Sequence, residues 1–316
     1  MEEGIRGMKF FTGSASRHLA EKIAQALGIR LGASETMRFS EGNTFVRVNE
    51  PVRGYDVYVL QTIGRDPNNE FMELLFWVDA FKRASANSVT AIMPYFSYAK
   101  GDKKDEPRVS IRARVCADAL EAAGVDRVVT MDLHSPQIQG FFRVPVDHLY
   151  ALPVLCRHFE RSGGDLVVVS PDAGFAKRAR AYARRLGASV AIGDKMRSGH
   201  DENAVVEEII GEVEGKDALI VDDFTTTCGS LIEAARAVLA RGARSVRACV
   251  SHCLLDERGL SALEASPLAE LLVTDTVENP LAASAPKIRI ASVAGLFAEA
   301  IKRIQRRESL SVLFEE

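Results

Sequence analysis

The chain has 316 residues, of which 47% are hydrophobic and 26% are charged, a composition typical of a globular protein with a substantial core. Its 40 basic and 43 acidic residues leave a net charge of −3, which excludes a bulk electrostatic attraction to nucleic acid or to an anionic membrane. The length predicts two domains, and no apolar run approaches the ~18 residues of a membrane span.

Apolar, β-branched runs alternate with helical patterns in the first half of the chain, an order that predicts a parallel sheet built from β-α-β units. Phe71–Ala84 and Ile111–Ala123 have apolar residues at helical spacing, and Trp77 in the first of them is expected to pack in a core or an interface. The predicted strands are Met8–Gly13, Tyr55–Thr62, Val89–Tyr95 and Arg127–Leu133.

The second half repeats this scheme. Helices are predicted at Ala176–Leu186, Ser230–Arg241 and Val293–Arg306. The predicted strands are Leu166–Asp172, Ser189–Gly193, Ala218–Asp223, Ser245–His252 and Glu270–Thr276.

Four strands end in similar chemistry, in the segments MDLHS, SPDAG, VDDFTTTCGS and VTDT, and this echo predicts two similar domains. Proline and polar residues interrupt the pattern near Pro145–Pro153, as expected of a boundary. We therefore expect an α/β protein with residues 1–148 and 149–316 as its domains, each a mainly parallel sheet flanked by helices. The last helix is a candidate to pack back on the first domain.

The five cysteines are odd in number and form no CxxC pair, which favours buried thiols in a reducing compartment over a disulfide framework. His252 and Cys253 are adjacent, but no second ligand pair follows at zinc spacing, so no metal is expected there. The first residues show no basic segment followed by an apolar one, and we expect a cytoplasmic protein. The cysteines are Cys116, Cys156, Cys228, Cys249 and Cys253.

The segment Ala218–Ser230 carries the strongest functional signal. Four apolar residues, typical of a buried parallel strand, lead directly into Asp222 and Asp223. A turn of hydroxyl side chains and a glycine follows and then a helix, so backbone N–H groups at the helix start are available to a phosphate. Carboxylates beside a phosphate repel it unless sugar hydroxyls or a divalent cation lie between them.

This segment resembles the phosphoribosyl-diphosphate (PRPP) binding motif of the type I phosphoribosyltransferase fold. Val129–Phe142 is similar to the signature of ribose-phosphate pyrophosphokinases, the enzymes that make PRPP. The resemblance extends from about Met8 to Phe314. Further segments follow in the family's order, namely Pro94–Ala99, Ser170–Asp172, Asp194–Arg197 and Val293–Leu296.

The resemblance implies Mg²⁺-dependent transfer of the diphosphate of ATP to the anomeric hydroxyl of ribose 5-phosphate, giving PRPP and AMP. It implies that Lys195 and Arg197 are catalytic and lie on the family's mobile loop, and that His134 and Asp172 hold the Mg²⁺-bound nucleotide. It also implies a homo-oligomer, a hexamer built from dimers. The residues implied for ribose 5-phosphate are Asp222, Asp223, Thr226, Thr227, Cys228, Gly229 and Ser230.

The departures from the family concentrate at the nucleotide end. An acidic pair of the family appears as Glu41 and Asn43, after Phe39, in a loop that reaches a neighbouring subunit's ATP site in the family. The implied nucleotide residues are Phe39, Glu41, Asn43, Lys100, Gly101, Asp102, Lys103 and His134. Arginine, glutamine and arginine are usual where Lys100, Gly101 and Lys103 stand. Lysine keeps the charge but loses the planar fork of arginine, and Gly101 offers no side chain to adenine.

Two departures lie at the sugar and diphosphate end. Thr226 replaces a common third aspartate, and Phe175 replaces a usual glycine. Around Arg108–Arg114 the chain differs from the family's regulatory-phosphate region, so no allosteric control is implied. Two alternatives stay open. One is the same chemistry with a different nucleotide donor or sugar-phosphate acceptor, and the other is a non-catalytic homologue that co-assembles with an active pyrophosphokinase.

Overall fold

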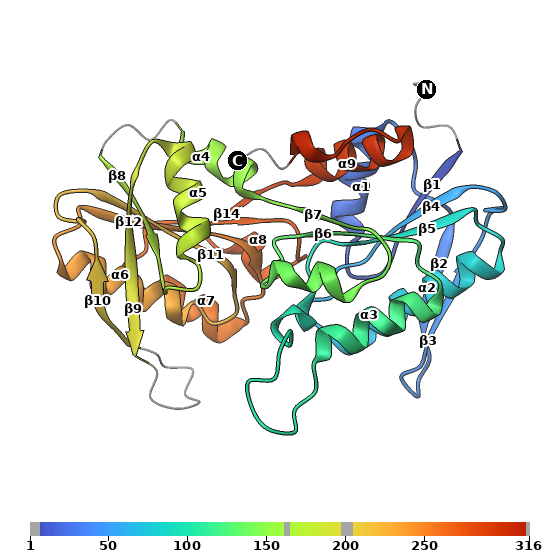
Figure 1. Cartoon of the computed structure of the whole chain (residues 1–316), viewed down its shortest axis with the longest axis horizontal. Helices are drawn as coiled ribbons and strands as arrows, with labels where there is room; N and C mark the ends of the chain where they lie inside the picture. Colours follow the sequence, from blue (N-terminus) through green and yellow to red (C-terminus); the bar gives the residue numbers. More distant parts are fainter. Residues whose placement is uncertain (1–6, 161–164, 197–204, 314–316) are drawn as a thin grey trace. The chain divides into compact units, whose positions relative to one another are not determined.

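The computed structural model describes residues 7–160, 165–196 and 205–313, with the backbone alone described at 194–196 and 205–207. The chain divides into two compact units, whose elements are labelled in Figure 1. The first unit contains the residues up to Tyr150 together with Thr276–Glu278 and the segment from Val293 onward. The second unit contains Ala151–Asp275 and Asn279–Ser292.

The first unit is built on a sheet of five parallel strands in the order β1-β4-β5-β6-β7. These strands are mostly apolar because a parallel sheet is covered on both faces. They are β1 (Met8–Thr12), β4 (Asp56–Leu60), β5 (Ser88–Met93), β6 (Arg127–Met131) and β7 (Val146–Leu149).

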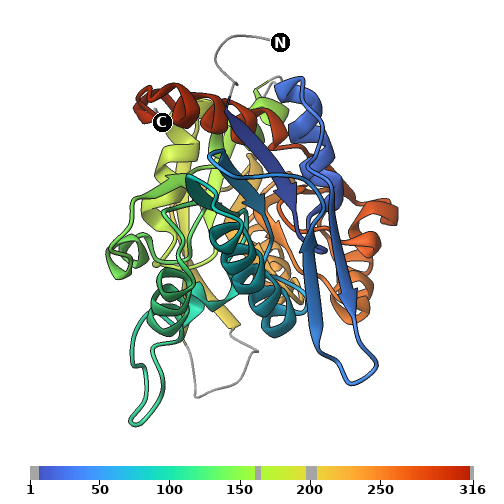
Figure 2. The same ribbon diagram turned by 90° about the vertical axis from the view of Figure 1, so that its right-hand side faces the viewer.

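Helices cover both faces of this sheet, with α1 and α9 on one face and α2 and α3 on the other (Figure 1). A separate antiparallel hairpin, β2 with β3, projects away from the sheet (Figure 2). The bounds are α1 (Arg17–Leu27), α2 (Pro67–Arg83), α3 (Arg112–Ala123), α9 (Ala294–Arg306), β2 (Ser34–Arg38) and β3 (Thr44–Val48). Short 3-10 turns lie at η2 (Ser97–Lys100), η3 (Pro136–Phe141) and η4 (Ser311–Leu313).

A buried carboxylate on α2 fastens the loop between β1 and α1. Glu73 is 3% exposed and accepts hydrogen bonds from the backbone N–H of Ser14 (2.9 Å), from Gln61 Nε2 (3.1 Å) and from Trp77 Nε1 (3.2 Å). Trp77 is fully buried, which confirms that it packs in a core. A buried carboxylate is tolerated only when its oxygens are satisfied in this way.

The second unit is built on a sheet of seven strands, in the order β10-β9-β8-β11-β12-β13-β14. The β9–β10 pair is antiparallel and every other neighbouring pair is parallel. The strands are β8 (Leu166–Ser170), β9 (Ser189–Met196), β10 (Val205–Ile210), β11 (Asp217–Thr225), β12 (Ser245–Cys253), β13 (Leu271–Thr274) and β14 (Ile288–Ala291).

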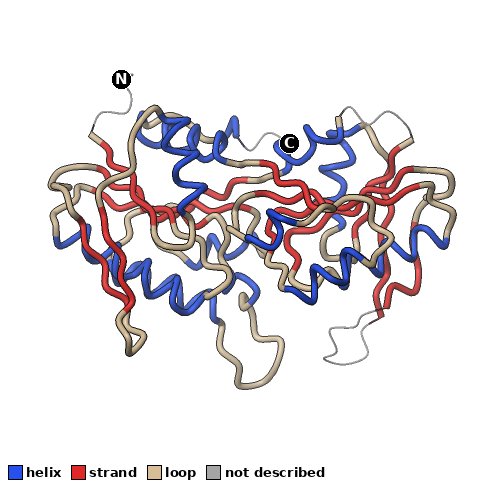
Figure 3. Tube along the Cα trace, turned by 180° about the vertical axis from the view of Figure 1, so that it is seen from behind, coloured by secondary structure: helices blue, strands red, loops and turns tan. Residues whose placement is uncertain are grey.

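Helices again flank the sheet; Figure 3 shows the helices in blue on both sides of the strands in red. Apolar side chains of α6 and α7, such as Leu231, Val238 and Leu263, share one core with Ile220 of β11 and Val250 of β12. The helices are α4 (Leu152–Phe159), α5 (Ala176–Leu186), α6 (Gly229–Ala240), α7 (Glu257–Glu264) and α8 (Pro280–Ser284).

The structure confirms the α/β class with parallel sheets flanked by helices. Each predicted strand and helix is present, with ends shifted by a few residues; β9 continues to Met196, beyond the predicted Gly193. The elements missing from the prediction include α1, the β2–β3 hairpin, β7, β10 and α7. All five cysteines are buried and free, as predicted. None of the described helices is both long and apolar enough to cross a membrane.

Replacing Glu73 by alanine removes the carboxylate that accepts from the buried donors of Gln61 and Trp77 and from the amide of Ser14, so we expect the free energy of unfolding to fall by about 3 kcal/mol. Trp77 is the single tryptophan of the chain, so its fluorescence during urea unfolding reports on the first unit. Glu299→Ala is the control, because it removes a partly exposed i,i+4 pair with Arg303 and should cost only about 1 kcal/mol. Equal losses in the two variants would contradict this account.

Candidate active site

β11 is the central strand of the second sheet, and two adjacent carboxylates lie near its carboxyl end. β8 and β12 are its parallel neighbours, so the loops after these three strands open at the same edge. Asp222 is half-buried and Asp223 is only 6% exposed. The two aspartates therefore lie where the sequence pattern predicts, at the carboxyl edge of a parallel sheet.

Asp172 brings a third carboxylate to this edge. It lies in the turn between β8 and α5, where its Oδ1 accepts a hydrogen bond from the backbone N–H of Phe175 at 3.2 Å. Burial, with the neighbouring carboxylates of Asp223 and then Asp172, raises the pKa of Asp222 well above its ordinary range. Like charges this close favour a cation or hydroxyl donors among them.

No set of three His, Cys, Asp or Glu side chains within the described ranges is placed to hold a metal ion by itself. Mg²⁺ commonly keeps several waters and takes one or two carboxylates together with phosphate oxygens. The aspartates at this edge suit that sparse kind of binding, in which protein groups supply only part of the coordination.

The loop after the aspartates is fixed by the hydroxyl of Thr225. Its Oγ1 accepts a hydrogen bond from the backbone N–H of Cys228 at 3.1 Å, and both residues are buried. Cys228 has φ = +58°, a left-handed conformation that is uncommon for a residue with a side chain. Gly259 of α7 supports the loop from behind, since an added Cβ there would lie 2.7 Å from the carbonyl oxygen of Thr226.

α6 begins directly after this turn and has an open N-terminus. The side chain of its N-cap, Cys228, makes no capping hydrogen bond. From the described part of the chain, one side-chain oxygen reaches the first amides: Gly229 N–H lies 3.5 Å from Thr227 Oγ1. Thr226 and Ser230 are exposed beside it. Free amides at the positive end of a helix, with hydroxyls around them, form a site for an anion.

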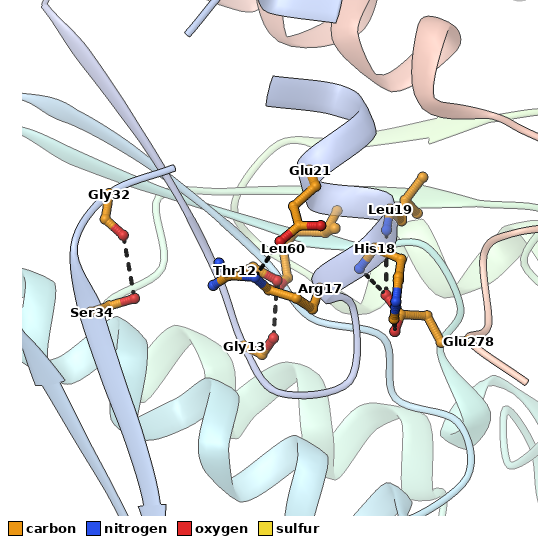
Figure 4. Close-up of polar contacts among 10 residues, drawn as sticks. All are labelled: Thr12, Gly13, Arg17, His18, Leu19, Glu21, Gly32, Ser34, Leu60 and Glu278. Carbon is orange, nitrogen blue, oxygen red and sulfur yellow. Dashed lines mark hydrogen bonds and ion pairs between the residues drawn. The ribbon is translucent and has the colours of Figure 1, made fainter. Parts of the chain in front are cut away.

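The first unit has a comparable junction between β1 and α1, but its amides are already occupied (Figure 4). The carboxylate of Glu278 accepts hydrogen bonds from the backbone N–H groups of His18 and Leu19. Glu73 accepts one from the backbone N–H of Ser14. A polar cavity of about 260 Å³ lies here, lined by Thr12, Gly13, Ser14, Arg17, Ser34 and Thr36. Carboxylates on its amides disfavour an anion, whereas no carboxylate of the described residues lies on the first amides of α6.

The residues implied for nucleotide binding all lie in the first unit. Phe39, Glu41 and Asn43 are exposed at the tip of the β2–β3 hairpin, whose turn is closed by a hydrogen bond from Phe39 N–H to Asn43 O at 2.8 Å. Phe39 is 44% exposed. The side chains at this tip therefore do not pack in the core of the first unit and are available for contacts with another molecule.

Lys100 ends the 3-10 turn η2 after β5, and Gly101 follows as a buried residue. Asp102 is half-buried, and Lys103 is exposed. The carbonyl oxygen of Gly101 accepts a hydrogen bond from the backbone N–H of Ala113 at 3.1 Å, which ties this segment to the start of α3.

His134 follows β6 and is exposed. The turn before it is held by His148, whose Nε2 accepts a hydrogen bond from the backbone N–H of Leu133 at 2.9 Å. His134 therefore belongs to the first unit, whereas Asp172, the other residue implied for the metal, belongs to the second.

Lys195 lies in β9, where its backbone pairs with Val206 of β10. Its side chain is not described, and Arg197 and the rest of the predicted catalytic loop, 197–204, lie outside the described residues. The roles of both basic residues stay predictions.

Thr225 is the residue that the sequence analysis missed at this site. The predicted phosphate loop begins at Thr226, one residue later. A hydroxyl three positions before a non-glycine helix N-cap was the available signal, because serine and threonine side chains bond to backbone groups a few residues along.

Comparisons with known proteins identify the family of the chain. Residues 8–124 match the model of the N-terminal domain of ribose phosphate pyrophosphokinase, and residues 200–315 match that of the phosphoribosyl synthetase-associated domain. The ribose-phosphate pyrophosphokinase of Caldanaerobacter subterraneus subsp. tengcongensis is 47% identical over 99% of this chain and 100% of its own. The chain belongs to the ribose-phosphate pyrophosphokinase family.

Other members of the family give the same result. The ribose-phosphate pyrophosphokinase of Clostridium acetobutylicum is 45% identical over 98% of both chains. The crystal structure of phosphoribosylpyrophosphate synthetase from Mycobacterium smegmatis matches with a TM-score of 0.89 and 36% identity, over 96% of this chain and 100% of that one. The chain is thus an enzyme of this family, and the resemblance seen in its motifs is confirmed.

The charge on Asp222 costs stability in this pyrophosphokinase without ligands. Because its pKa is higher in the folded chain than in the unfolded one, stability falls as the pH rises above the ordinary range of an aspartate. We expect Asp222→Asn to raise Tm by a few degrees at pH 7.5, and the gain to shrink as the pH falls toward about 4. Thermal unfolding without ligands measures this.

Asp217 at the start of β11 is a control of opposite sign. Hydrogen bonds from Arg244 and Ser245 lower its pKa to about 2, so its charge stabilises the fold at neutral pH. Asp217→Asn should lower Tm at pH 7.5. If Asp222→Asn lowered Tm as well, the result would contradict the claim that the charge of Asp222 destabilises the fold at neutral pH.

Proposed function

We propose that the chain transfers the diphosphate of ATP to the anomeric hydroxyl of ribose 5-phosphate, forming PRPP and AMP. The anomeric oxygen attacks the β-phosphorus, the bond from the α-phosphate oxygen to the β-phosphorus breaks, and the hydroxyl proton is released. The observation that carries the proposal is the adjacent carboxylates of Asp222 and Asp223 next to the open N-terminus of α6.

These groups match the two ends of a sugar phosphate. The amides of Gly229 and Ser230, with the hydroxyls of Thr226, Thr227 and Ser230, would accept the 5-phosphate at the positive end of the helix. Asp222 and Asp223 would accept hydrogen bonds from the ribose hydroxyls. Cys228 contributes its backbone alone, because burial raises the pKa of its thiol to about 12 and leaves it unreactive.

By the family resemblance, His134 and Asp172 would hold the Mg²⁺-bound nucleotide, and carboxylates such as those on β11 are ligands that Mg²⁺ accepts. When bound, the ion neutralises negative charge on the triphosphate. We assign Lys195 and Arg197 to the transferring group, where their positive charges would stabilise the charge that develops. Phosphoryl transfer relies mainly on such positioning and electrostatic stabilisation.

We also propose a homo-oligomer, a hexamer built from dimers, on the strength of the family resemblance. The exposed apolar side chains of Met37 (39%) and Phe39 (44%) on the β2–β3 hairpin provide a surface suited to a second copy. The five free, buried cysteines suit a reducing compartment such as the cytoplasm.

A product assay tests the proposed reaction. Purified protein with Mg²⁺ and ribose 5-phosphate should give PRPP and AMP from ATP, observed by phosphorus NMR. EDTA should abolish turnover, and Lys195→Ala should lower kcat at least about a hundredfold, the usual loss when one transition-state charge is removed. Wild-type turnover by Lys195→Ala would refute its assigned role.

A panel of dATP, GTP, CTP and ADP in the same assay separates the alternatives. PRPP from another donor but not from ATP would replace ATP as the substrate. No PRPP from any donor would overturn the proposed reaction and point to another acceptor or to a regulatory subunit.

Thr225 should act on the sugar phosphate through the loop that it holds. Thr225→Val keeps the shape and removes the acceptor for Cys228 N–H, so we expect KM for ribose 5-phosphate to rise about tenfold while KM for ATP stays unchanged. Thr225→Ser keeps the hydroxyl and should restore the wild-type KM. Glycine adopts the left-handed turn without strain, so adding Cys228→Gly to Thr225→Val should recover part of the loss. A raised KM in both the valine and the serine variants would contradict this role.

A further inference from the structure

Position 101 favours glycine because a neighbouring side chain fills the space there, and not because of its backbone conformation. Its φ of −104° lies in a region open to any residue, so the conformation does not require glycine. An added Cβ would instead lie 2.5 Å from Nε of Arg112 and 3.0 Å from its Cβ. The side chain of Arg112 thus occupies the space in which a side chain at position 101 would stand.

The two residues are held together by the backbone. Arg112 is the first residue of α3, and the next residue, Ala113, donates its N–H to Gly101 O at 3.1 Å. Gly101 N–H in turn donates to Tyr98 O at 2.9 Å. The contact between Arg112 and Gly101 is therefore built into the junction of η2 and α3.

Arg112 does not contribute to the stability of the helix that carries it. A cation in the first turn opposes the helix dipole, and this first turn contains no acidic residue. Among the described residues, no side chain forms an ion pair or a hydrogen bond with its guanidinium. Arg114, two positions later, has both kinds of partner. It forms an ion pair with Asp118 at 2.6 Å and donates a hydrogen bond to Phe141 O at 2.9 Å.

The chemistry of Arg112 complements that of its neighbours. Lys100 and Lys103 on the adjoining segment are compact point charges, suited to phosphate oxygens. Neither offers a flat surface, and Gly101 has no side chain. The guanidinium of Arg112 is planar and weakly hydrated, and it stacks on aromatic rings.

We propose that Arg112 binds the base of the nucleotide donor and takes the place of a side chain at position 101. This assignment rests on the proposed function, with ATP as the donor, and on the resemblance, which implies that the segment containing Lys100 and Lys103 binds the nucleotide. Arg112 determines affinity for the base, and the two lysines contact the phosphates.

Calorimetric titration of the full chain, with Mg²⁺ but without ribose 5-phosphate, tests this assignment independently of turnover. Arg112→Ala should weaken ATP binding about tenfold and leave the binding of inorganic tripolyphosphate, which has no base, within about twofold. Arg112→Lys should be as weak as alanine, because an ammonium has no plane. Arg114→Ala is the control and should bind ATP like the wild type.

Gly101→Ala provides a second, reciprocal test. The new methyl group should displace the guanidinium and weaken ATP binding, yet cause no further loss when added to Arg112→Ala. Additive losses of ATP affinity in the double variant would contradict the inference that the two side chains compete for one space.

Three further results would overturn the proposal: unchanged ATP affinity in Arg112→Ala, an equal loss for tripolyphosphate, or rescue by lysine. A wild-type chain that binds no ATP would overturn it too. A wild-type chain that binds ATP but forms no PRPP would refute the proposed reaction alone, since the titration still decides the role of Arg112.

Discussion

Repulsion between carboxylates at the carboxyl end of β11 is the constraint on which the candidate active site depends. Burial, together with the nearby carboxylates of Asp223 and Asp172, raises the pKa of Asp222, a cost that the fold without ligands bears. The open N-terminus of α6 lies next to these carboxylates, and the ligands proposed for this site, a sugar phosphate and Mg²⁺, would offset this cost. Binding and stability are in conflict at this edge, as is usual at functional sites.

The two strand–loop–helix junctions show how one local architecture is used in two ways. At β1–α1, carboxylates of the chain itself, Glu73 and Glu278, occupy the loop and helix amides, and the junction serves to hold the first unit together. At β11–α6 the amides are left open, and Thr225 fixes a left-handed turn at Cys228. The difference lies in which side chains reach the amides, a property of tertiary structure rather than of the local pattern.

The fold class and the place of the aspartates could be predicted from sequence because buried parallel strands are apolar runs that end in polar residues. The β2–β3 hairpin could not, since none of its strand residues is buried and its strands show no clear alternation. The capping of α1 by Glu278 joins residues 260 positions apart, and the reason for Gly101 appears only when Arg112 is placed over it. The role of Thr225 depends on the left-handed backbone of Cys228, and its trace in the sequence is only a hydroxyl three positions before the N-cap.

A crystal structure of the full chain with ribose 5-phosphate and Mg²⁺ would test the central claim most directly. The account predicts the 5-phosphate on the backbone amides of Gly229 and Ser230, with the ribose hydroxyls within hydrogen-bonding distance of Asp222 and Asp223. A sugar phosphate bound in the cavity at the start of α1, with the β11–α6 junction empty, would contradict it.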